Sequence, residues 1–348
     1  MSSRPEPEAP PALVLLSRFV TALRQHPPLA LFFLGLLACI ALLILVLVVG
    51  VWFVARGGLE SPPPPGPGAP DTQRGPEGPA SPADSSIHLV MGNPSRATTD
   101  EANRDNYLMR KPFFALSYNN GKGTPNWVSW CLRQSDLGQA PRADFYPDPD
   151  LPPTFKHVKP GDYSGSGFDR GHMCPHSDRA SSDEASTATF VMTNMVPQSP
   201  ACNQKAWADL EDYCRDLVRK KRQTLYIVAG PAGQGGEGTK GPREIIGRAE
   251  KVTVPAKCWK VVLALDDGRG DAGDVDRVSR TSRVFAVVMP NDQSVGHGWA
   301  KYRTSASDVE KLTGYHFFDR VPADIIGPLK ERVDRETIPP GRHGGGDD

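Results

Sequence analysis

The chain has 348 residues, with 40 basic and 40 acidic side chains and therefore a formal net charge of zero. This balance excludes a chain that is basic throughout, so any positively charged surface must be local. Apolar residues make up 39% of the sequence, enough for the core of one large domain or two small ones. Six scattered cysteines without a CxxC pair argue against a disulfide framework or a zinc knuckle.

The N-terminal part predicts a membrane anchor. Residues 1–28 carry Arg18 and Arg24, and residues 29–55 contain no charge. A helix of that length reaches roughly 40 Å and can span a bilayer with some tilt. A buried core helix and a cleaved signal peptide are the alternatives, but the run is long for either and ends in a poor cleavage site. The arginines favour a cytoplasmic N-terminus, so we expect a single-pass protein whose bulk is extracytoplasmic.

Two segments have the composition of disordered chain. Residues 56–86 are rich in proline and glycine, with four consecutive prolines at 62–65. Such a segment cannot bury enough apolar surface to fold and is expected to act as an extended spacer. Residues 340–348 consist mostly of glycine and aspartate and form the second such segment, a tail.

Residues 87–339 are expected to form the globular domain. Short β-type runs occur at 113–118, 127–132, 224–229, 258–265 and 284–289. Helical patterns occur at 182–190, 203–222 and 308–313. Before the last helix, Ser307 stands three residues ahead of Glu310, the pattern of a capping box, and Gly314 is its stop signal. The irregular mixture of elements predicts an α+β fold.

The first cluster with chemical potential runs from Gly167 to His176 and contains Asp-Arg-Gly-His. Histidine titrates near neutrality and can accept a proton from water. The adjacent Arg170 can hold a phosphate and keep His172 neutral by repulsion. A surface loop with incidental charge is the alternative for this cluster alone. Cys174 and His176 could suggest zinc, but alternate side chains of an extended segment need not converge on one ion.

The second cluster comprises residues 190–198 and 203–211. The predicted helix that begins at Asn203 buries Trp207 and further apolar residues at helical spacing. Asn203 and Glu211, two turns apart, can face a common site. Taken alone, Asn203 could serve only as a helix cap, and Glu211 would most often be exposed.

Together, the two clusters resemble the DNA/RNA non-specific endonuclease family. Its Asp-Arg-Gly-His hallmark is present at 169–172, followed by Asn-Met-Val-Pro-Gln at 194–198 and Asn-Gln-x-x-Trp-x-x-Leu-Glu at 203–211. The resemblance covers most of residues 87–320. It implies a ββα-metal (His-Me finger) nuclease fold, with the histidine on a β-hairpin and the metal-binding asparagine on the crossing helix. It also implies DNA and RNA as substrates and Mg²⁺ as cofactor, with Mn²⁺ as its substitute.

The resemblance also implies roles for individual residues. His172 would deprotonate the attacking water, Asn203 would bind the single metal ion directly, and Glu211 would contact it through water. The supporting residues would be Asn194 for the histidine and metal region, Arg170 for phosphate contact and, by a looser match, Arg142 for the transition state.

Two other functions stay open at this point. One is a catalytically silent surface protein that binds polyanions, against which the intact His172, Asn203 and Glu211 argue. The other is a membrane-linked phosphodiesterase acting on a non-nucleic substrate, which only an assay with varied substrates separates from a nuclease. A homodimer and the preference between DNA and RNA are also left open.

Overall fold

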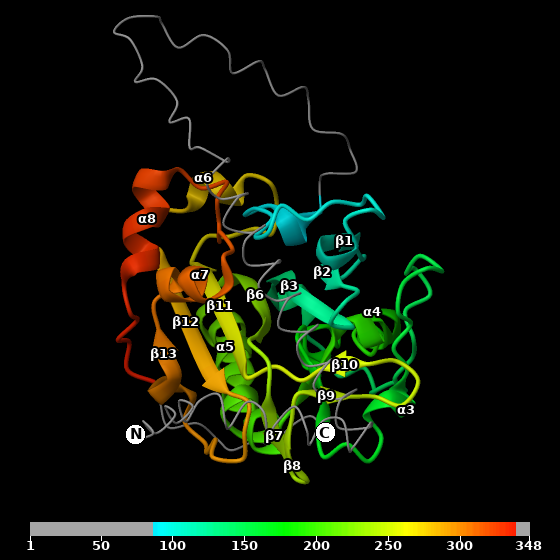
Figure 1. Ribbon diagram of the computed structural model, residues 1–348. Coiled ribbons are helices and arrows are strands. Elements are labelled where there is room, and N and C mark those ends of the chain that lie inside the picture. The colour runs from blue at the N-terminus through cyan, green and yellow to red at the C-terminus, as the bar shows by residue number, and fades with distance from the viewer. Residues whose placement is uncertain (1–85, 339–348) are drawn as a thin grey trace, which may run out of the picture. The chain divides into compact units, whose positions relative to one another are not determined.

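A seven-stranded antiparallel sheet runs through the computed structural model, which describes residues 86–338 (Figure 1). In spatial order, its strands are β1 (Tyr107–Arg110), β2 (Ala115–Asn119), β3 (Thr124–Leu132), β6 (Thr224–Ala232), β11 (Lys257–Leu265), β12 (Arg283–Pro290) and β13 (Arg303–Thr304). The five predicted strands are confirmed, and β1 and β13 are additional. Strand β2 begins two residues later than predicted, where the Phe113 carbonyl accepts a hydrogen bond from Arg179 Nε at 2.7 Å.

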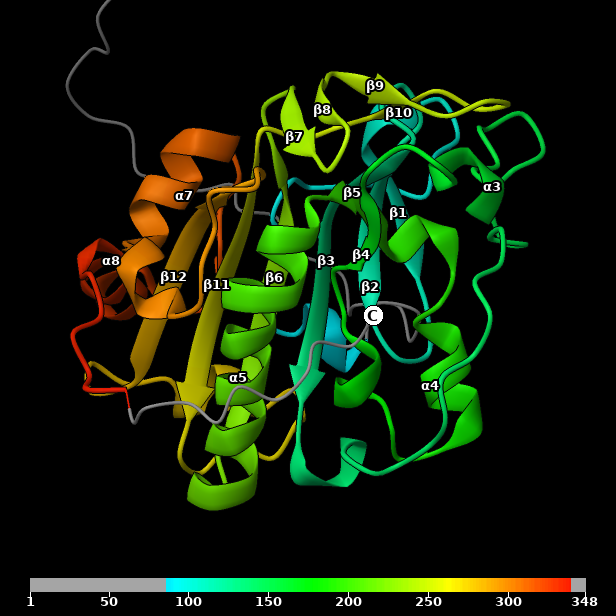
Figure 2. The same ribbon diagram turned by 90° about the horizontal axis from the view of Figure 1, so that it is seen from below.

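Alternate side chains of the central strands point to opposite faces of the sheet, and nearly all of them are buried. Both faces of the sheet are therefore covered. On one face, α5 (Ala208–Lys221) lies along the sheet and contributes to a core with residues of β3, β6, β11 and β12 (Figure 2). On the other face, α7 (Ala306–Thr313) and α8 (Ala323–Glu331) pack against the alternate residues of the same strands. The predicted mixed α and β fold is therefore confirmed.

A separate two-stranded sheet carries the Asp-Arg-Gly-His motif. It pairs β4 (Asp169–His172) with β5 (Met195–Gln198) in antiparallel register. Glycine is required at position 171, since a Cβ atom there would lie 2.2 Å from Gln198 Oε1. Soon after β5, a π-helical segment, Cys202–Trp207, continues directly into α5. The two clusters seen in the sequence thus become two strands followed by a helix.

Smaller elements complete the fold. They are α3 (Pro160–Tyr163), α4 (Asp183–Ala188), α6 (Asp274–Arg277), β7 (Gly236–Gly238), β8 (Gly241–Arg243), β9 (Ile245–Ile246) and β10 (Val252–Thr253). The carboxylate of Asp162 in α3 accepts hydrogen bonds from three consecutive backbone N–H groups at 248–250. These bonds fasten the β9–β10 connection to α3, and they help to lower the pKa of Asp162 against the opposing effect of burial.

The predicted capping box at Ser307 and Glu310 is wrong. Helix α7 begins at Ala306, and Ser305 caps it by accepting a hydrogen bond from Asp308 N at 3.0 Å. Ser307 therefore already lies in the first turn. The Glu310 carboxylate instead accepts hydrogen bonds from Lys330 Nζ and from a backbone N–H of the following loop. Gly314 ends the helix with a φ of 74°, as predicted.

The alternative in which Asn203 serves as a helix cap is also wrong. Its backbone N–H donates to Ser199 O at 2.9 Å, so the helix has begun before Asn203. The predicted boundary was late because Pro200 suits the first position of a helix and only the residues after it show helical spacing. Trp207 and the other apolar residues of this helix are buried as predicted.

Within residues 86–338, no helix is both long enough and apolar enough to cross a membrane. The predicted span at 29–55, the linker up to residue 85 and the tail at 340–348 lie outside the described residues. The five cysteines in the described part of the chain are buried free thiols.

Candidate functional site

A small pocket lies where β4 meets the beginning of the long helix. Its lining includes His172, Asn203 and Glu211, together with Pro175, His176 and Ala208. Three of the six predicted site residues are therefore brought together. His172 is the last residue of β4, Asn203 lies in the π-helical segment, and Glu211 follows two turns later in α5. Glu211 is only 7% exposed, so the surface position expected for an isolated glutamate is wrong.

Aromatic side chains hold the imidazole of His172. His172 is 8% exposed, and its ring packs edge-on against Phe190 at 4.9 Å between centroids and at a tilt against Phe145 at 5.5 Å. Contacts on two sides restrict rotation of the ring. The histidine is therefore held in a buried position at the edge of the pocket.

Asp169, the first residue of the hallmark motif, orients Asn203. Asn203 Nδ2 donates to Asp169 Oδ2 at 3.0 Å, and Gln204 Nε2 donates to the same oxygen at 3.1 Å. Because an ionised carboxylate only accepts hydrogen bonds, the amide nitrogen of Asn203 faces Asp169 and Oδ1 occupies the other branch of the amide. Burial raises the pKa of Asp169, and the two amide donors oppose that rise.

The donor set of the pocket fits Mg²⁺ better than zinc. An amide oxygen and a carboxylate are the hard ligands that Mg²⁺ takes while keeping several waters. Cys174, a possible zinc ligand in the sequence, is fully buried, and burial raises its pKa well above the ordinary value, so it stays a thiol. Among residues 86–338, no three His, Cys, Asp or Glu side chains are placed to share one ion.

Each of the two predicted arginines contacts an aromatic ring that packs against His172. The guanidinium of Arg142 lies 5.2 Å from the ring centroid of Phe190, and that of Arg170 lies 5.2 Å from the centroid of Phe145. Arg170 also donates to Pro160 O at 2.8 Å. Neither arginine lines the pocket itself, but both place positive charge beside it.

Asn194 lies beneath the site and does not line the pocket. Its side chain is fully buried, where Oδ1 accepts from Cys174 N at 2.9 Å and Nδ2 donates to Cys174 O at 2.8 Å. A further bond joins Nδ2 to Thr189 O. Asn194 therefore fixes the chain two residues after His172, a supporting position.

Sequence reasoning missed Lys260. This residue of β11 lies in the core with its Nζ 3.3 Å from Glu211 Oε1. A single lysine inside the apolar run 258–265 is the signal that could have identified it, since a charge in a strand buried on both faces needs a partner. Phe145 and Phe190 were missed as well, and no local pattern distinguishes them from ordinary core residues.

Another buried histidine, His88, lacks the properties of a general base. Its Nε2 contacts Pro112 O at 3.1 Å, and its Nδ1 accepts from Cys131 N at 3.3 Å. Burial, assisted by the charge of Arg179, lowers its pKa to about 3. His88 is therefore neutral, with both nitrogens engaged.

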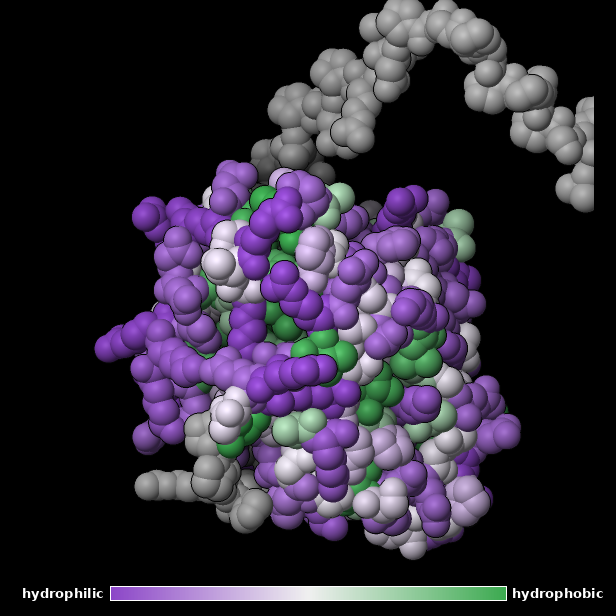
Figure 3. Space-filling view, turned by 90° about the vertical axis from the view of Figure 1, so that its left-hand side faces the viewer, coloured by the Kyte–Doolittle hydropathy of each residue, from purple (hydrophilic) through white to green (hydrophobic). Residues whose placement is uncertain are grey.

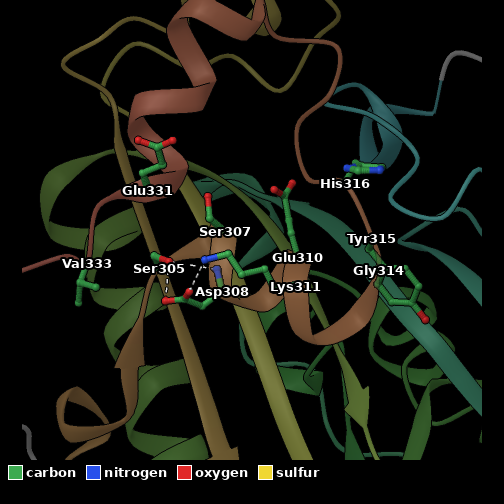
Figure 4. A pocket seen from close by; sticks show the side chains of 10 residues that line it. All are labelled: Ser305, Ser307, Asp308, Glu310, Lys311, Gly314, Tyr315, His316, Glu331 and Val333. Atoms are coloured by element: carbon green, nitrogen blue, oxygen red, sulfur yellow. Dashed lines mark hydrogen bonds and ion pairs between the residues drawn. The ribbon is translucent and has the colours of Figure 1, made fainter.

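A second hollow lies beside α7 and the end of α8 (Figure 4). Its side chains mix both charge signs, and the ones at its floor already pair with each other: Lys311 and Ser305 both bond to Asp308. The surrounding face is mostly hydrophilic, with small hydrophobic patches between the hydrophilic residues (Figure 3). This hollow has no catalytic constellation of the kind found around His172.

Comparison with known proteins shows the family of the chain. The sequence profile of the DNA/RNA non-specific endonucleases matches residues 91–324. A protein of Nostoc sp. named "Nuclease" is 47% identical over 251 residues, which are 72% of this chain and 86% of the relative. The human protein "Nuclease EXOG, mitochondrial" is 35% identical over 213 residues, 59% of this chain and 55% of its own length.

A solved structure has the same fold. A chain in the crystal structure of the EndoG/EndoGI complex superposes with a TM-score of 0.56 at 25% sequence identity. The match covers 68% of this chain and 92% of that chain.

Proposed function

Because the chain belongs to the DNA/RNA non-specific endonuclease family and is a phosphodiester hydrolase, we propose that it cuts DNA and RNA in a Mg²⁺-dependent reaction at the pocket of His172, Asn203 and Glu211. The meeting of these three side chains in one pocket is the observation that carries the proposal. The β4–β5 pair and the following helix would then be the ββα-metal unit. Mn²⁺ would substitute for Mg²⁺.

His172 acts as the general base in this proposal. Its ring is held by Phe190 and Phe145 at the edge of the pocket, so the imidazole is presented in one orientation. It takes a proton from the attacking water, a step for which a group titrating near neutrality is suited. The fixed ring avoids the cost of ordering the base at each turnover.

Asn203 would hold the metal ion through Oδ1, and Glu211 would contact it through water. The bond from Nδ2 to Asp169 sets the amide so that the oxygen is the group left to bind. When bound, Mg²⁺ supplies positive charge beside the scissile phosphate and the leaving 3′ oxygen, so the products carry 5′-phosphates. A neutral amide ligand leaves that positive charge largely uncompensated.

In this proposal Arg170 contacts phosphate and Arg142 stabilises the transition state. Each guanidinium lies 5.2 Å from the centroid of one of the two aromatic rings that hold His172, which supports a role for both in contacting the substrate backbone. Contacts to phosphate and sugar carry no sequence information, which accounts for cleavage without sequence preference.

A cleavage assay tests this function. The full chain, purified in detergent, is expected to nick plasmid DNA and to degrade RNA with Mg²⁺, to lose the activity in excess EDTA and to regain it when Mg²⁺ is restored. Binding to heparin and hydrolysis of a simple non-nucleic phosphodiester are measured for comparison. Binding of nucleic acid and heparin without cleavage would identify a catalytically silent polyanion binder. Hydrolysis of the simple diester alone would identify a different phosphodiesterase.

We also propose that the domain acts outside the cytoplasm, tethered to the membrane by residues 29–55. The proposal rests on the length of the uncharged span and on Arg18 and Arg24 before it. Protease added to intact cells is expected to remove the nuclease domain and leave a short membrane-bound stub. Lysed cells serve as the control. Protection of the domain in intact cells, with digestion only after lysis, would establish the opposite orientation.

A further inference from the structure

Lys260 is a buried cation in the middle of the sheet. Its side chain is 1% exposed, and its neighbours in the adjacent strands are Ala229 of β6 and Val287 of β12. The alternation of β11 directs it to the same face as α5. A lysine at such a position is rare unless its charge is paired.

Two tryptophans and one glutamate surround the ammonium group. Nζ lies 4.3 Å from the ring centroid of Trp207 and 5.5 Å from that of Trp130. It also lies 3.3 Å from Glu211 Oε1. The aromatic faces attract the cation without competing for hydrogen bonds, so the directional partner in this group is Glu211.

The surrounding contacts make the arrangement rigid. Trp130 Nε1 donates to Asp178 Oδ2 at 3.0 Å, and Arg215 of α5 donates to Asp178 Oδ1 at 3.1 Å. The chain just after the motif is thereby joined to β3 and to the helix that carries Glu211. Lys260 therefore has little freedom to move relative to the pocket.

The pairing has an electrostatic consequence for the pocket. Glu211 lines a site that must admit phosphate groups. Without Lys260 the negative charge of Glu211 would repel the substrate, whereas the Lys260 cation offsets that charge and binds one of its oxygens. The ion pair is thus placed where its loss would affect chemistry as well as stability.

We infer that Lys260 is a positioning residue for phosphodiester hydrolysis and acts through Glu211. This inference rests on the proposed function, in which Glu211 contacts the metal ion through water. A residue that only stabilises the core would instead change unfolding while leaving turnover of the folded enzyme unaltered.

The test compares Lys260→Met, Glu211→Gln and the double variant in the full chain, with kcat on plasmid DNA and the thermal midpoint measured for each. Lys260→Met alone is expected to lower kcat by about 10–100-fold, as for groups that support a metal ligand. The double variant, which removes both charges, is expected to match Glu211→Gln in kcat within about twofold, because coupled residues are not additive. Lys260→Arg, which keeps the charge, is expected to retain more activity than Lys260→Met.

Lys330→Met is the matched control, because Lys330 forms a comparable ion pair with Glu310 on the other face of the sheet. It is expected to change the thermal midpoint but not kcat. The inference would be overturned if the fold-losses in kcat of the two single variants multiplied in the double variant. Unchanged kcat in Lys260→Met would also overturn it. If Lys260→Met does not fold, Lys260→Gln takes its place in the same comparison. An inactive wild type, or a fully active Glu211→Gln, would instead refute the proposed function.

Discussion

Replacement of His172 by alanine is expected to lower kcat on plasmid DNA by at least about 10²-fold, the usual contribution of a general base. The expectation follows from its place at the pocket, where Phe190 and Phe145 hold the ring in one orientation. The other histidine of the lining, His176, has its Nε2 engaged 3.0 Å from Ala140 O. Initial rates under saturating Mg²⁺ and substrate measure the effect.

His316→Ala is the control for loss of a histidine. His316 is exposed and lines the second hollow near α7, so its replacement is expected to leave kcat unaltered. Circular dichroism and thermal unfolding establish that the His172 variant is folded. A folded His172→Ala enzyme within a few-fold of the wild type would remove the residue from the role of base.

Asn203→Ala is expected to lower activity by at least about 10²-fold. Loss of a group that only supports a metal ligand can lower activity by as little as roughly 10-fold, and a direct ligand should matter more. The side chain is the one whose amide oxygen Asp169 leaves available for Mg²⁺. Its backbone N–H bonds to Ser199 O within the helix, so the substitution removes no cap and the fold is expected to persist. The dependence of rate on Mg²⁺ concentration and calorimetric Mg²⁺ binding without nucleic acid are the two measurements.

Gln204→Ala is the matched control for this variant. Gln204 donates to the same oxygen of Asp169 as Asn203 does, yet it is absent from the pocket lining. We expect a much smaller loss than for Asn203→Ala. Equal losses in the two variants would show that the hydrogen bonds to Asp169, and not a metal ligand, account for the effect. Collapse of the Asn203→Ala circular dichroism spectrum would show that the residue is chiefly structural.

Most of the central sheet could be predicted from the sequence. Its longer strands contain runs of β-branched and aromatic residues that are bounded by turn residues. The pair of β4 and β5 was reached only through the family resemblance, since four-residue strands carry too little periodicity. Boundaries that depend on single hydrogen bonds were predicted less well. Ser305 and Ser307 are both suitable caps for α7, and only the path of the chain decides between them.

The sequence by itself determined the family of this protein and its candidate site residues, through the hallmark at 169–172 and the helix motif at 203–211, which contain His172, Asn203 and Glu211. Only the tertiary structure decided how these groups are held. Asp169 reaches Asn203 across 34 residues, and Lys260 reaches Glu211 across 49. Such contacts arise from the packing of a helix on a sheet, whereas periodicity and propensity report only on neighbours within a few turns.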